Sequence, residues 1–182
     1  MSLARRLSIS LTGAAVAAAL ALAAPAVAQA PPATFTVGGE VNNPSTQTVA
    51  DLAKLPQHNL RVKFISGKGA ERHTYRGPYL YDVVNQAEPD FDPDIKNDEL
   101  RFYVSATGSD GYAAIVSWGE IDPDFAGRKI LLAVSEDGRS LAADGPRLVV
   151  PRDRHGGRYV TNVVSIRVGD SDADVDGEQA GP

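Results

Sequence analysis

Apolar and polar residues alternate in several short runs of this chain, with the period of a half-buried β-strand. The clearest run is 60–64, where Leu60, Val62 and Phe64 alternate with two basic residues. A Gly-Lys-Gly loop at 67–69 follows, and residues 73–76 predict a return strand. A β-hairpin is therefore expected over this region.

The same alternation predicts further strands over residues 35–41, 100–106 and 112–116, with an Asp110-Gly111 turn between the last two. The run 164–168 also alternates and predicts an edge-type strand that closes the domain. The run 130–134 is continuously apolar, which is typical of a strand buried on both faces. A short strand is expected at 147–150.

Helical patterns are fewer. Residues 49–55 predict a short helix that Pro56 ends, and residues 118–121 predict a single turn. Leu80, Val83, Val84 and Ala87 share one helical face. Because strand signals dominate, the predicted fold class is a β-rich α+β domain with mixed sheets and a few short helices.

The N-terminus predicts the compartment. Arg5 and Arg6 precede an Ala/Leu-rich stretch and a small-residue cleavage site at 26–28, so residues 1–28 are expected to be a signal peptide. A retained membrane anchor is the alternative. We expect a periplasmic or secreted protein without stable membrane insertion after cleavage. An ordinary secretion signal is favoured over the twin-arginine route, which the Arg pair also resembles.

Charge and composition exclude several classes. The chain carries a net charge of −5 and has no cysteine, so disulfides and thiolate metal sites are ruled out. The acidic residues of 169–182 account for much of the net charge, and this segment predicts a disordered acidic tail. The rest is close to neutral, which argues against nucleic acid as a partner. The expected organisation is a spacer at 29–34, one domain at 35–168, and the tail.

Three segments together resemble the sulfite-oxidase-type molybdopterin-binding domain. The first is Tyr-Arg-Gly-Pro-Tyr-Leu-Tyr-Asp-Val-Val at 75–84, which is similar to the family's strand-into-helix step. The second runs from Ser109 to Ile121, and the third combines 131–133, 145–151 and the end of the domain. The resemblance covers residues 35–168 and implies that fold, with an oxidoreductase and molybdopterin as the family's usual activity and cofactor.

Two departures put the catalytic part of that resemblance in doubt. Catalytic members carry a metal-ligating cysteine on the segment after the strand that corresponds to 60–64, where this chain has Ser66. A hydroxyl forms an alkoxide far less readily than a thiol forms a thiolate. The family's Val-Lys-Trp near the C-terminus, whose lysine helps to hold the cofactor phosphate, reads Val160-Thr161-Asn162 here. No cofactor is therefore certain, and molybdopterin remains open.

An arginine group near the C-terminus is the best candidate site. The segment 147–158 contains four arginines and one acidic residue. Arg147, Arg152 and Arg158 are the candidate residues for binding an anion or a cofactor. Guanidinium groups hold phosphate or carboxylate with two hydrogen bonds, and the glycines at 156–157 let a backbone approach an anion. The alternative is a solvated loop whose arginines pair with nearby carboxylates.

Two other segments supply candidate cofactor- or anion-binding residues. Ser66, Lys68 and His73 lie on the glycine-containing loop, which could form a second wall or be an ordinary hairpin loop. His73 also alternates with a tyrosine on a strand, which favours a structural role. Asp110 and Tyr112 place a carboxylate and a phenol near a strand start, although Asp-Gly is usually a turn.

No catalytic residue can be named, and no metal site is predicted: the histidines lack local metal-binding spacing, and the tail run at 172–177 lacks the glutamate that a calcium loop requires. The sequence favours an exported, non-catalytic module that binds a small anion or an extracytoplasmic protein partner. The alternatives are a molybdopterin-dependent oxidoreductase and a module that docks through a sheet edge and the acidic tail.

Overall fold

The structure is a computed structural model, and it describes residues 33–172. The predicted signal peptide at 1–28, most of the spacer and the tail after residue 172 lie outside the described residues. Within the described part of the chain, no helix is both long and apolar enough to cross a membrane.

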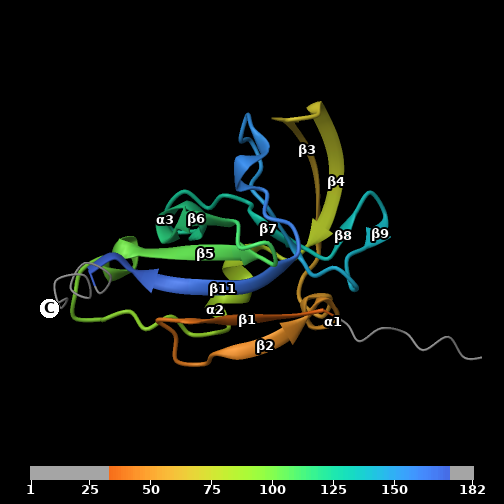
Figure 1. Ribbon diagram of the computed structural model, residues 1–182. Helices are drawn as coiled ribbons and strands as arrows, with labels where there is room; N and C mark the ends of the chain where they lie inside the picture. Colours follow the sequence, from red (N-terminus) through yellow and green to blue (C-terminus); the bar gives the residue numbers. More distant parts are fainter. Residues whose placement is uncertain (1–32, 173–182) are drawn as a thin grey trace, which may run out of the picture.

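A five-stranded sheet forms the main layer (Figure 1). Its strand order is β2-β1-β11-β5-β6. Strand β1 pairs with β11 in parallel, and the other neighbours are antiparallel. The bounds are β1 Thr34–Gly39, β2 Ser45–Thr48, β5 Phe102–Gly108, β6 Ala113–Ser117 and β11 Val163–Asp170.

Strand β11 lies in the middle of this sheet, so the prediction of an edge-type strand at 164–168 is wrong. Its alternating pattern arises because one face packs on the core, where Ile166 and Val168 are fully buried and the intervening Arg167 is exposed. Val164 is exposed because the strand register shifts between Val163 and Ser165. Alternation reports which face is covered and carries no information on whether a strand has one neighbour or two. The strand continues to Asp170, two residues past the predicted end of the domain.

Short helices cover the buried face and connect the strands. They are α1 Val49–Leu52, α2 Leu80–Asn85 and α3 Trp118–Ile121, with 3-10 turns at Asp98–Arg101 and Gly156–Arg158. The helices at 49–52 and 118–121 each begin with a capping box, which explains how four-residue helices persist. The strand predicted from residue 100 begins at Phe102, because Leu100 belongs to the preceding 3-10 turn.

A second sheet stands away from the first. Its order is β3-β4-β8-β9, with β3 at His58–Ser66, β4 at Gly69–Gly77, β8 at Ser135–Glu136 and β9 at Arg139–Ser140. Figure 1 shows the long hairpin β3–β4 rising from the body of the molecule, with the loop before β11 beside it. The hairpin predicted from 60–64 and 73–76 is present and longer than expected.

Between the two sheets, β7 (Leu131–Ala133) pairs with β10 (Arg147–Val149). All of residues 130–134 are buried, as their continuous apolar run predicts. One apolar cluster lies under the five-stranded sheet, and a smaller one, containing Phe64, Tyr75 and Tyr159, joins the hairpin to the body. The structure is thus β-rich α+β, as predicted.

Candidate functional site

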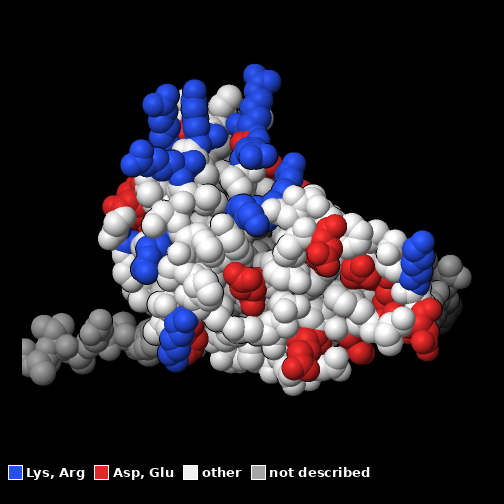
Figure 2. Space-filling view, turned by 180° about the vertical axis from the view of Figure 1, so that it is seen from behind, with Lys and Arg blue, Asp and Glu red and all other residues white. Residues whose placement is uncertain are grey.

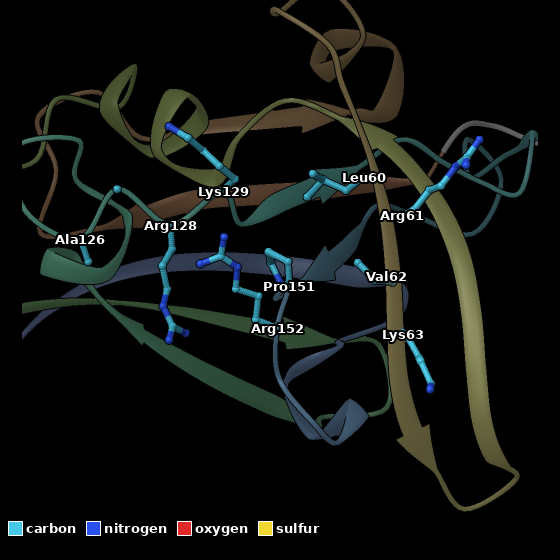
Figure 3. Close-up of a pocket in the computed structure, with 10 residues that line it drawn as sticks. Leu60, Arg61, Val62, Lys63, Ala126, Arg128, Lys129, Pro151 and Arg152 are labelled. Atoms are coloured by element: carbon cyan, nitrogen blue, oxygen red, sulfur yellow. The ribbon is translucent and has the colours of Figure 1, made fainter.

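A cavity of about 630 Å³ lies between the outer edge of β3 and two loops. We call it the basic cavity. Its lining residues are Leu60, Arg61, Val62, Lys63, Ala126, Gly127, Arg128, Lys129, Pro151 and Arg152. Figure 3 shows Leu60 and Val62 on the cavity side of β3, whereas the side chains of Arg61 and Lys63 lead away on the other side. The strand therefore presents apolar side chains and its own backbone to the cavity.

The opposite wall supplies the positive charge. Arg128 pairs with Glu120 at 3.1 Å, and the Lys129 ammonium lies 5.1 Å from the centre of the Tyr79 ring. The side chain of Arg152 has no hydrogen bond or ion pair with any of residues 33–172. Its backbone is left-handed, with a φ of 73°. That conformation costs a non-glycine residue about 1–2 kcal/mol, so the surrounding loop must hold it in place.

The far face of the hairpin is basic as well. Arg61, Lys63, Arg72 and Arg76 are exposed on this face, which we call the basic hairpin face. None of them has an ion pair with a described residue. Lys63 lies directly opposite Arg72 in the strand register. Like charges directly opposite each other destabilise a sheet, so this pair of basic residues does not contribute to the stability of the fold.

Charge is unevenly distributed over the face of the molecule in Figure 2. Figure 2 shows Lys and Arg gathered at the top, over the hairpin and the neighbouring loop, while Asp and Glu dominate the lower right. The near-neutral charge of residues 35–168 therefore conceals a strongly basic end. The basic cavity lies at that end, where an anion would experience the sum of these charges.

Two of the predicted arginines bind carboxylates of the protein itself. Arg147 donates to Glu136 at 2.8 Å, and its guanidinium lies 5.5 Å from the Tyr75 ring. Arg158 donates from two nitrogens to Asp153 at 2.8 Å each and lies 3.3 Å from Glu120. These hydrogen bonds with Asp153, together with nearby negative charge, raise the pKa of Arg158 despite its partial burial. Neither residue lines the basic cavity.

Ser66 and Lys68, predicted as binding residues, lie together at the end of the hairpin. The Ser66 hydroxyl accepts the Lys68 backbone N–H at 3.0 Å, and it also interacts with Glu71. These contacts are those of a hairpin loop, which is the alternative that the sequence left open. Neither residue lines the basic cavity.

His73 lies among three carboxylates, 2.8 Å from Asp137, 3.2 Å from Glu136 and 3.3 Å from Glu71. Burial lowers the pKa of His73, but the hydrogen bonds to Asp137 and Glu71 and the Glu136 charge outweigh it, and the pKa is raised. The ligand atoms of His73, Glu136 and Asp137 lie within 4.8 Å of one another, close enough to hold a metal ion. Because Glu136 already binds Arg147, we assign no metal to this group.

Asp110 and Tyr112 occupy the β5–β6 turn. The Asp110 carboxylate accepts the Tyr112 backbone N–H at 3.0 Å, which is the ordinary role of aspartate in a turn. Tyr112 lies just before β6 rather than within it, and its hydroxyl donates to the Gly157 carbonyl. This contact ties the turn to the loop before β11.

Of the eight predicted site residues, only Arg152 lines the basic cavity. Sequence reasoning missed Arg61, Lys63, Arg128 and Lys129. In the sequence, Arg61 and Lys63 are the polar positions of an alternating strand, and their repeat at every second residue is the signal for a basic face. Nothing in the sequence places the Arg128-Lys129 pair beside that strand, because the two segments meet only in the fold.

Comparisons with known proteins support the fold. No known protein family matches the chain, and none of the curated proteins does. Among solved structures, the chain is similar to the sulfane dehydrogenase SoxCD from Paracoccus pantotrophus, with a TM-score of 0.61 and 18% identity. The match covers 76% of this chain and 38% of that one, so this chain spans well under half of that protein. The likeness is a distant relationship of fold.

Proposed function

We propose that the protein is an exported, non-catalytic binding module that holds an anionic ligand at the basic cavity. The observation that carries the proposal is the wall of Arg128, Lys129 and Arg152, in which Arg152 is held in a left-handed backbone without a carboxylate partner among the described residues. The cavity volume of about 630 Å³ lies within the range of about 300–1,000 Å³ that is usual for ligand sites.

Physical chemistry favours an anion over other ligands. A guanidinium donates two parallel hydrogen bonds to a carboxylate or phosphate, and an ammonium adds a compact charge beside it. The apolar side chains of Leu60 and Val62 line the strand side of the cavity and reduce its exposure to water, which strengthens the attraction. The basic hairpin face adds longer-range attraction.

The molybdopterin-dependent oxidoreductase is less well supported by the residues present. The hydroxyl of Ser66 is already engaged by the Lys68 backbone N–H and by Glu71, and it lies at the exposed hairpin end. A hydroxyl is a hard ligand where the family uses a thiolate. These donors do not fit a molybdenum centre, so we derive no redox step.

Thermal unfolding in the presence of inorganic phosphate, sulfate or citrate tests the proposal. A ligand that binds only the folded state stabilises it by about 2.7 kcal/mol at a hundred times its Kd, which raises the Tm. Sodium chloride at matched ionic strength corrects for screening. We expect Arg152→Gln and Lys129→Gln to reduce the shift, and Arg167→Gln to preserve it, because Arg167 is exposed on the five-stranded sheet. Equal shifts in all three variants would contradict the proposal.

A further inference from the structure

Strand β3 has a free edge along the basic cavity. In an antiparallel pair, successive residues turn their backbone N–H and C=O alternately toward the partner and away from it. The N–H of Ile65 points away from β4, because it donates to the Arg154 carbonyl at 2.9 Å. By the same alternation, the backbone groups of Lys63 and Arg61 face outward. No described residue bonds to the backbone of either one on this edge.

Within residues 33–172, another segment of the protein pairs with this edge, but only at one position. Ile65 forms a parallel bridge with His155, beside the Ile65–Arg154 hydrogen bond. Alongside residues 60–63 of β3 no described segment continues this pairing, and the basic cavity occupies the place that a neighbouring strand would fill. Proteins usually protect such edges, because unpaired backbone groups pair readily with another chain. Here the edge lies open along a cavity.

The two faces of β3 define the side chains that an added strand should carry. On one face, Arg61 and Lys63 are basic and have no ion pair with a described residue. On the other, Leu60 and Val62 are apolar and face the cavity. Neighbouring strands place paired side chains about 5 Å apart on each face. A complementary strand therefore alternates acidic and apolar residues.

We propose that the free edge of β3 at Arg61 and Lys63 binds an extended segment of a partner protein, with alternating acidic and apolar residues, as an added strand. Backbone hydrogen bonds to the edge supply affinity, and the alternating side chains supply specificity. The added strand would lie along the basic cavity, whose positive charge attracts an acidic segment. This inference rests on the proposed function and names the form of its anionic ligand.

Binding of two labelled peptides of equal composition tests the alternation. One alternates Asp and Val over seven residues, and the other groups the same residues into blocks. We expect the alternating peptide to bind about tenfold more tightly, which is about 1.4 kcal/mol. Equal affinities would overturn the inference, because charge alone would then account for binding.

N-methylation of the alternating peptide tests the backbone contacts, since it removes amide donors and leaves every charge in place. We expect methylation at two successive edge-facing amides to weaken binding about tenfold, because two backbone hydrogen bonds would be lost. In the protein, Arg61→Pro and Arg61→Gln remove the same charge, but only the proline removes the outward N–H. Proline is tolerated at an edge position of this kind. Only Arg61→Pro should abolish the preference for the alternating peptide.

The outcomes separate this inference from the proposed function. If phosphate binds but neither alternation nor methylation matters, the cavity binds anions and the added strand is wrong. If neither phosphate nor peptide binds, both proposals fail. A chain that ends at Asp172 provides the remaining comparison with the full chain. If only the truncated chain binds the alternating peptide, the edge is occupied by the protein's own acidic tail, which would overturn the partner assignment.

Discussion

Arg147 donates to the Glu136 carboxylate at 2.8 Å while its guanidinium covers the Tyr75 ring at 5.5 Å. The pair joins β10 to β8, and both side chains are less than one-fifth exposed. Burial above all, together with the Glu136 hydrogen bond, raises the pKa of Tyr75. The contact therefore links three elements at the base of the hairpin.

Replacing Arg147 by Gln should destabilise the fold by about 1–3 kcal/mol, because Glu136 would lose its ion pair with Arg147 while remaining largely buried. Urea unfolding measures the loss. Arg139→Gln is the control, since that side chain is 70% exposed in its pair with Asp144. An unchanged free energy of unfolding combined with a lost response to phosphate would show that Arg147 binds ligand instead.

The His73 cluster should make stability depend on pH. Because the pKa of His73 is raised in the folded protein, its contribution is fully present below the unfolded value of about 6.5 and is lost as pH rises through the folded value. The wild-type protein should therefore exceed His73→Gln in stability by more at pH 5 than at pH 8. Urea titrations at both values measure the difference, and a gap that widens toward pH 8 would contradict the assignment.

Gly77 should not tolerate a side chain. A Cβ at this position would lie 2.3 Å from the Leu132 carbonyl oxygen and 2.7 Å from the Ala133 Cα. Because both are backbone atoms, we expect Gly77→Ala to cost at least about 1–3 kcal/mol in thermal or urea unfolding. Gly67→Ala is the matched control, since nothing lies within 4 Å of its Cβ position. Equal stability of the two variants would contradict the packing described for β4 and β7.

The burial of Ile166 in the core predicts a large loss of stability when its side chain is shortened. This residue is fully buried, whereas Ile115 on the sheet-edge strand β6 is 57% exposed. Ile166→Ala should therefore cost about 2–5 kcal/mol, and Ile115→Ala much less. Urea unfolding of both variants gives the comparison. Similar losses would argue against the burial of Ile166 in the core.

The sequence predicts individual strands well, because the pattern of apolar and polar residues within each strand reflects which of its faces are buried. The alternation at 60–64 and the buried run at 130–134 depend only on which faces are covered, and both appear in the structure. The neighbours of β11 could not be predicted in this way. Its parallel pairing with β1 joins residues near opposite ends of the domain, and no local pattern encodes such a partner.

The candidate site was harder to predict for the same reason. Arginines close together in sequence suggested one anion site, but Arg147 and Arg158 each bind a carboxylate brought to them by another segment. The basic cavity instead joins β3 to the loops at 126–129 and 151–152. A count of charges along the chain cannot distinguish an arginine that has a partner from one that lacks it.

The separation of charge seen in Figure 2 bears on how the molecule meets other molecules. A body with opposite charge at its two ends carries a large electric dipole, which rotates it in the field of a charged neighbour before contact. The protein would thus approach an acidic partner with the β3–β4 hairpin, and the free edge of β3, facing that partner. At about 0.15 M salt, charges interact over only about 8 Å, so this alignment would act in the last moments of approach.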